Sequence, residues 1–182
     1  MAPKRNNPGP QQVKYSWYPE KLERQIFFMK EKNCFFSCSS YEILDEDGKA
    51  LGKTVKMLNK CDYTGFLTHN LLQTVGVMVD TKTVDRQLLV MPAVKRCEDA
   101  ATWLQILKAG YPCLGLPEVL CGYRRVVGSL SSNKLEGASH IWNLYRNVEH
   151  LSISLSLYCF VRYALLAVWK RYYPDTNARQ AK

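Results

Sequence analysis

Acidic residues are scarce in this 182-residue sequence, which has 16 Asp and Glu side chains against 25 Lys and Arg. Most of the resulting net charge of +9 lies near the two ends. Residues 1–34 hold seven basic and three acidic side chains, and residues 150–182 hold five and one. A nearly neutral middle between basic ends suits contact with anionic lipid headgroups or with RNA phosphates.

The sequence also lacks a regular cysteine pattern and a signal peptide. Its seven cysteines are odd in number and irregular in spacing, which argues against the disulfide framework of a small secreted protein. We therefore expect mostly reduced thiols. The first twenty residues contain no apolar run, so no signal peptide is predicted.

Motifs for catalysis are missing as well. The three histidines, His69, His140 and His150, have no motif around them, and no nucleophile elbow, phosphate loop or dinucleotide fingerprint occurs. We therefore expect no catalytic residues, no cofactor and no small-molecule substrate, and we interpret the chain as not an enzyme. A small membrane enzyme that uses Cys or His residues is the least favoured alternative.

No metal site is predicted either. Cys34 and Cys38 would need a second pair of ligands at comparable spacing, and Cys61, His69 and Cys97 are scattered along the chain. The acidic turn at residues 45–48 lacks the remaining ligands of a calcium loop. We read these residues as unrelated thiols and solvated carboxylates.

The hydrophobic pattern predicts a mainly α-helical protein in four parts. Residues 1–18 form a basic extended arm, and residues 19–132 form a small, mainly helical domain. Residues 133–173 contain no proline and form one long helix, followed by a basic polar tail at 174–182.

Within the small domain, the pattern predicts several elements. A first helix begins at Pro19 and ends near Asn33, and a second runs from about Glu98 to Ala109, with acidic residues in its first turn. Residues 35–58 form a possible short β-hairpin. Residues 63–79 suit a buried or membrane-surface helix, residues 84–91 a short helix, and residues 110–128 a compact loop with room for one short helix at Pro117.

The longest apolar run lies at residues 151–169 and predicts a transmembrane span. Its 19 residues include one charged side chain, Arg162, and their number matches the thickness of a bilayer. An interfacial belt of aromatic and basic residues would follow it, made of Trp169, Lys170, Arg171, Tyr172 and Tyr173. A buried soluble helix stays an alternative, and so does a strand, because leucines and serines alternate at its start.

Four residues of this run are predicted to contact a partner. Ser152, Ser156 and Cys159 lie on one helical stripe, where small side chains allow a second helix to approach closely. Arg162 would be costly in lipid on its own, so we expect it to pair within an assembly. At the other end of the chain, the basic arm carries Lys4, Arg5, Lys14 and Trp17.

These features favour a non-catalytic accessory subunit of a large membrane complex. A respiratory or ATP synthase assembly of the mitochondrial inner membrane fits best, with other subunits and anionic membrane lipid as partners. The excess of Lys and Arg after the span places the C-terminus on the matrix side. The alternative is a soluble RNA-associated subunit of an organellar ribosome, because the arm mixes cations with aromatic rings.

Overall fold

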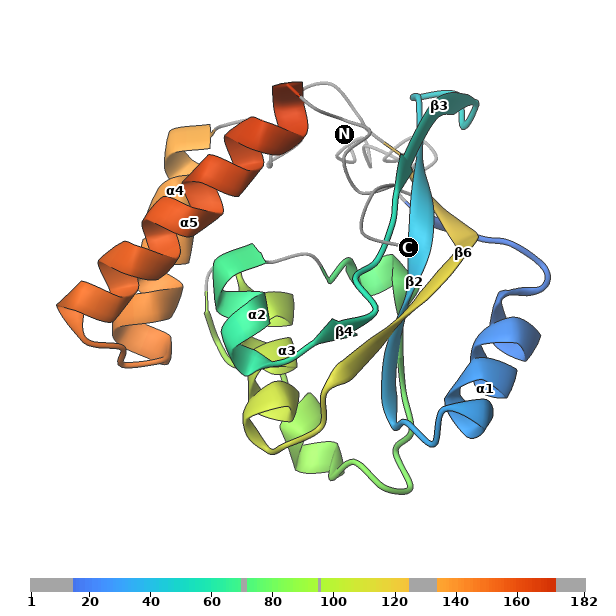
Figure 1. Ribbon diagram of the computed structural model, residues 1–182, viewed down its shortest axis with the longest axis horizontal. Coiled ribbons are helices and arrows are strands. Elements are labelled where there is room, and N and C mark those ends of the chain that lie inside the picture. Colours follow the sequence, from blue (N-terminus) through green and yellow to red (C-terminus); the bar gives the residue numbers. More distant parts are fainter. Residues whose placement is uncertain (1–14, 70–71, 95, 125–133, 173–182) are drawn as a thin grey trace, which may run out of the picture.

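The computed structural model describes residues 15–69, 72–94, 96–124 and 134–172, with the backbone alone at 134–136 and 167–172. Its centre is a six-stranded sheet with helices on both sides (Figure 1). The expected mainly helical fold is therefore wrong, and the chain is mixed α/β. The strands are β1 (Tyr15–Trp17), β2 (Phe36–Leu44), β3 (Ala50–Val55), β4 (Lys60–Cys61), β5 (Val77–Val79) and β6 (Cys113–Arg124). The helices are α1 (Lys21–Glu31), α2 (Tyr63–His69), α3 (Glu98–Lys108), α4 (Lys134–Asn143) and α5 (Ile153–Tyr172), with short helical turns η1 (Thr74–Gly76), η2 (Arg86–Leu89) and η3 (Leu144–Val148).

Strands β2 and β6 form the middle of the sheet and run parallel to each other. Ser37 lies opposite Leu114 near one end of the pairing, and Leu44 lies opposite Arg124 at the other. β1 pairs antiparallel with β6, and β3 pairs antiparallel with β2. The short strands β4 and β5 pair with the first residues of β6 and β2. Parallel strands need a crossover connection, and the segment between β2 and β6 supplies it with α2 and α3.

The hairpin predicted for residues 35–58 is confirmed as β2 and β3, in which Leu44 lies opposite Ala50. Asp45 closes the turn, because its Oδ1 accepts hydrogen bonds from the backbone N–H groups of Asp47 at 3.0 Å and Lys49 at 2.8 Å. The helices predicted from Pro19 and from Glu98 are also confirmed, as α1 and α3.

Two other predictions for the small domain are wrong. Residues 63–79 do not form one helix, because α2 ends at His69 and η1 and β5 occupy residues 74–79. Residues 113–124 form a central strand instead of a loop. Pro117 fits this strand because the pairing of β6 with β2 jumps from Leu116 to Val119, which leaves an irregularity where a missing N–H costs nothing.

The core lies between the sheet and the layer formed by α2 and α3, while α1 covers the other side of the sheet (Figure 1). Phe36 of β2 packs on Trp103 of α3 with ring centroids 5.8 Å apart. Phe66 of α2 and Leu104 and Ile106 of α3 are fully buried in the same cluster. Burial of these large side chains supplies most of the driving force that holds the layers together.

The C-terminal region is a helical pair, so the long continuous helix predicted at 133–173 is wrong. The α4 helix passes into the π-helical turn η3, and the chain then reverses at His150, which adopts a left-handed φ of 52°. α4 and α5 lie side by side (Figure 1), with the rings of Trp142 and Phe160 in edge-on contact at 5.8 Å.

The transmembrane span predicted at 151–169 is also wrong. Among the helices that the structure describes, none is long and apolar enough to cross a membrane. The side chains of this run lie on two sides of α5, one buried and one exposed. Ser156 and Cys159 are buried against the rest of the chain, while an apolar stripe at spacings of four, made of Ile153, Leu157, Val161 and Leu165, is exposed. Serines and Arg162 interrupt what would otherwise be a hydrocarbon-compatible surface.

Candidate active site

The short turn η1 connects three parts of the molecule through its three residues. Thr74 donates a hydrogen bond from Oγ1 to Oδ2 of Asp99 at 2.9 Å. The carbonyl oxygen of Val75 accepts from the indole Nε1 of Trp17 at 3.0 Å. The carbonyl oxygen of Gly76 accepts from Nε2 of Gln25 at 2.9 Å. Side chains from β1, α1 and α3 therefore converge on one turn.

Asp99 is a half-buried carboxylate in the first turn of α3. Its Oδ1 accepts from the backbone N–H of Ala100 at 2.8 Å, and Oδ2 accepts from Thr74. No ion pair involves Asp99 within the part of the chain that the structure describes. Two other carboxylates, by contrast, are paired with cations: Glu149 binds Lys108 at 2.7 Å, and Glu118 binds Arg24 at 2.8 Å. Asp99 is therefore an acid that hydrogen bonds hold in place and that no ion pair among the described residues neutralises.

Three tyrosine rings, from β1, β2 and β6, form an aromatic cluster. Tyr15 packs on Tyr123 with centroids 5.6 Å apart, and Tyr123 makes an edge contact with Tyr41 at 6.2 Å. Burial raises the pKa of the Tyr15 hydroxyl, and Tyr123 and the nearby Asp99 raise it further. Tyr15 is exposed, and an exposed aromatic ring offers an apolar surface on which the apolar face of a sugar can pack.

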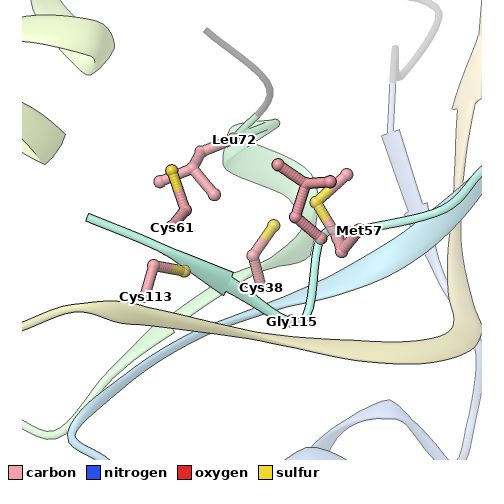
Figure 2. Close-up of a pocket in the computed structure, with 7 residues that line it drawn as sticks. Cys38, Met57, Cys61, Leu72, Cys113 and Gly115 are labelled. Carbon is pink, nitrogen blue, oxygen red and sulfur yellow. The ribbon is translucent and has the colours of Figure 1, made fainter. Parts of the chain in front are cut away.

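A small cavity lies elsewhere in the core, and three thiols line it. Cys38, Cys61 and Cys113 surround it together with Met57 and other apolar residues (Figure 2). Its volume of about 10 Å³ leaves space for about one water molecule, so it is no substrate site. Burial raises the pKa of Cys38 and of Cys61 to about 12. All seven cysteines are free, and no group of three or more metal-ligating side chains occurs among the residues that can be placed.

The residues predicted to contact a partner helix lie apart from this site, in α5 and at Ser152 immediately before it. Ser156 and Cys159 are buried inside the chain, and Ser152 is exposed, with its hydroxyl 3.1 Å from that of Ser154. Arg162 is exposed and donates to the hydroxyl of Tyr158 at 3.2 Å. Packing of these residues against a second protein stays a prediction.

The other predicted contact residues fall largely outside the description. Lys4, Arg5 and Lys14 precede the first described residue, and Tyr173 follows the last. Trp169, Lys170, Arg171 and Tyr172 belong to α5, but their side chains are not described. Trp17 is the exception: it belongs to β1 and binds η1, so it is part of the candidate site.

The central residues of this site cannot be recognised from the sequence. In the sequence, Asp99 is only an acid in the first turn of a helix, and Thr74 lies in a segment predicted to be helical. The two residues are 25 positions apart, and no local spacing connects them. Only the folded structure shows that Asp99 is half-buried and that it lies shortly after Arg96, which has a left-handed φ of 66°.

Comparison with known proteins finds bacterial proteins that are named as glycosyltransferases. The chain is 37% identical over 155 residues to TuaG of Bacillus subtilis, named as a teichuronic acid biosynthesis glycosyltransferase, covering 85% of this chain and 61% of TuaG. It is 30% identical over 146 residues to an uncharacterized glycosyltransferase of Haemophilus influenzae, covering 80% and 57%. It is 26% identical over 165 residues to WfaP of Escherichia coli, covering 91% and 63%. WfaP is named as a UDP-Glc:alpha-D-GlcNAc-diphosphoundecaprenol beta-1,3-glucosyltransferase.

These similarities correct the function expected from the sequence. The chain spans about 60% of the length of these relatives, and no family model matches it. The relatives are named as enzymes, so a non-catalytic respiratory subunit and an RNA-associated ribosomal subunit are both wrong. They are bacterial, which contradicts a mitochondrial location. The name of WfaP includes a sugar nucleotide, which contradicts the expected absence of small-molecule substrates. Over most of its length, the chain is thus similar to bacterial glycosyltransferases.

Proposed function

We propose that this chain transfers a sugar from a nucleotide donor to an acceptor hydroxyl group, and that Asp99 takes the proton of that hydroxyl group. Similarity to three proteins named as glycosyltransferases supports the reaction class. The observation that carries the choice of residue is the geometry of Asp99, a half-buried carboxylate without an ion-pair partner in the described ranges, oriented by Thr74 at 2.9 Å.

The chemistry needs such a group. In transfer from a nucleoside-diphosphate sugar, the bond between C1 and the diphosphate oxygen breaks, and the diphosphate leaves with the electron pair. The hydroxyl oxygen of the acceptor forms the new bond to C1 and loses its proton to the base. A carboxylate within reach of that hydroxyl speeds the step by a factor of about 10² to 10⁴. Tyr15 is exposed and near enough to Asp99 for its charge to raise the pKa of the Tyr15 hydroxyl, so its ring offers a surface on which a sugar of the acceptor can rest.

The donor and acceptor named for WfaP give the first substrates to test. The purified chain is incubated with UDP-glucose carrying a radiolabelled sugar and with an N-acetylglucosamine diphospholipid, and label in the lipid fraction is counted over time. Other sugar nucleotides are tested in parallel. We expect transfer by the unaltered chain and a fall in kcat of at least about 100-fold in Asp99→Asn, with little change in the KM of the donor.

Asp85→Asn is the matched control. Asp85 is also an aspartate at the start of a helical turn, where Oδ1 accepts from the backbone N–H of Gln87 at 2.9 Å, but the turn that it caps is η2 and not η1. Its variant should keep full activity. Equal activity of Asp99→Asn and the unaltered chain would refute the assignment of the base, and no transfer from any donor would refute the reaction.

A further inference from the structure

We propose that three side chains, Trp17, Lys21 and Gln25, position Asp99 for the reaction by holding η1 against the sheet. We call these three residues the brace. The inference rests on the proposed function and adds positioning residues to it. The brace acts on Asp99 through η1, since its hydrogen bonds end on the carbonyl oxygens of Val75 and Gly76.

Gln25 is the centre of the brace. Its side chain is fully buried, and Nε2 donates both to the carbonyl oxygen of Gly76 at 2.9 Å and to Oγ of Ser37 at 3.0 Å. Its Oε1 accepts from Nζ of Lys21. One amide thus connects α1, the central strand β2 and η1, and every polar atom of its side chain has a partner, as a buried amide requires.

Lys21 is a buried ammonium group that pairs with no carboxylate of the described residues. It is 1% exposed, and its Nζ lies 3.4 Å from the carbonyl oxygen of Gly76 and 5.1 Å from the centroid of the Trp17 ring. Burial lowers the pKa of Lys21. A buried amine held by neutral oxygens and a ring is costly. Such local costs are expected where a sequence is selected for function in addition to stability.

The turn η1 connects the brace to the carboxylate of Asp99. Gly76 packs directly on β2, because a Cβ atom there would lie 2.6 Å from the carbonyl oxygen of Ser39. Val75 and Gly76 are therefore fixed on the inner side by the brace and the strand. Thr74 is the next residue outward, and its hydroxyl orients Asp99. A displacement of about 1 Å at a catalytic group can lower a rate by as much as 100-fold.

The sharpest variant is Gln25→Glu. A glutamate keeps the size of the side chain and can still accept from Lys21, but an ionised carboxylate cannot donate to Gly76 or Ser37. Trp17→Phe is a second variant that keeps a ring and removes the donor to Val75. Tyr145→Phe is the control, because it removes a different buried hydrogen bond, to the carbonyl oxygen of Leu67 in α2.

The first readout is a double-mutant cycle in kcat with Thr74→Val. We expect Gln25→Glu and Trp17→Phe each to lower kcat about tenfold, with the KM of the donor unchanged. In the Thr74→Val background the same changes should lower kcat less than about twofold, because the link to Asp99 is already broken. Purely additive effects would show that the brace does not act through Thr74 and would overturn the inference.

The second readout is amide hydrogen exchange at Gly76 and Val77, whose N–H groups donate to Gln73 and Thr74. Exchange there should be at least about tenfold faster in Gln25→Glu and unchanged in Tyr145→Phe. Unchanged exchange in Gln25→Glu would overturn the inference without reference to activity. An inactive Asp99→Asn together with a fully active Gln25→Glu would refute the brace and leave the proposed function intact. No transfer by the unaltered chain would refute the proposed function itself, and with it the catalytic role of the brace.

Discussion

Gly115 leaves no room for a side chain between β6 and the segment that precedes β4. A Cβ atom at this position would lie 1.9 Å from the carbonyl oxygen of Leu58. Because the obstructing atom belongs to the backbone, a rotamer change cannot relieve the clash. The backbone N–H of Gly115 also donates to the carbonyl oxygen of Asn59 at 3.1 Å, which fixes the close approach.

We therefore expect Gly115→Ala to lower the free energy of unfolding by about 3 kcal/mol or more, measured by urea denaturation. The matched control is Gly137→Ala. Gly137 lies in α4, where a Cβ atom would meet no other atom of the described residues within 4 Å, so alanine there should stabilise the helix by about 0.5–1 kcal/mol. A Gly115→Ala chain as stable as the parent would contradict the packing described for β6.

At the scale of single residues, the sequence indicates chemistry only where local motifs exist. Mostly reduced thiols are predicted from irregular spacing, and all seven cysteines are free. Asp99 cannot be identified in this way, because its significance comes from Thr74 and Tyr15, which are distant in sequence. Lys21 and Gln25 look like ordinary polar residues of an amphipathic helix, yet both are buried.

Among the elements, the C-terminal helical pair is joined to the layer of α2 and α3 through a buried carboxylate. Glu149 has a side chain only 4% exposed, and it binds Nζ of Lys108 at 2.7 Å and accepts from the hydroxyl of Tyr63 at 2.6 Å. Burial raises the pKa of the Tyr63 hydroxyl, and the hydrogen bond to Glu149 raises it further. Glu149 therefore joins the end of η3 to both α2 and α3.

Removing one partner should loosen this region. We expect Lys108→Ala to lower the free energy of unfolding by about 1–3 kcal/mol, because it leaves a buried carboxylate with fewer partners. The control is Arg24→Ala, which breaks the exposed pair with Glu118 and should cost less than about 1 kcal/mol. Urea denaturation of both variants measures the two losses in the free energy of unfolding. Equal losses would contradict the structural role given to Glu149.

The prediction of elements succeeds where the pattern is local and fails where context decides. α1 and α3 follow from their first-turn acids, and the β2–β3 hairpin follows from the turn at Asp45. β6 is hidden by Gly115 and Pro117, residues that usually interrupt a strand. α5 is predicted as a helix, but its predicted surroundings are wrong, because the chain reverses at His150 and buries one side of it against α2 and α4.

For the molecule in full, buried thiols should decide how the free energy of unfolding changes at alkaline pH. Burial raises the pKa of Cys38 and Cys61 to about 12, and burial with two nearby acids raises that of Cys97 to about 11. In the unfolded chain these thiols ionise near pH 8.5 to 9. Above that pH the folded state keeps protons that the unfolded state has lost, so the free energy of unfolding falls as pH rises toward 12.

Urea denaturation with a reducing agent present, between pH 7.5 and about 10.5, checks this expectation. Each such thiol contributes up to about 1.4 kcal/mol per pH unit. Lys21 opposes the trend, because its lowered pKa makes the unfolded state bind more protons. The variant Lys21→Met should therefore show a steeper fall than the parent. A flat profile in the parent would contradict the burial of the thiols.

The overall architecture is beyond prediction from the sequence because it depends on one pairing between distant strands. Nothing local in residues 36–44 or 113–124 specifies that these segments lie side by side and parallel. This pairing is what makes the fold mixed α/β and not mainly α-helical. When the sheet is not recognised, the apolar helical segments have no partner within the chain, and they are misread as parts of a membrane complex.

The parallel pairing also sets the order in which the protein can assemble during synthesis. Ser40 and Leu116, joined by a hydrogen bond of 3.2 Å, are 76 residues apart. The β2–β3 hairpin must therefore wait on the ribosome until α2, α3 and β6 have been made, because an isolated two-stranded hairpin is marginally stable. Nascent chains that stop before Arg124 should remain sensitive to protease, and protection should arise late and in a single cooperative step.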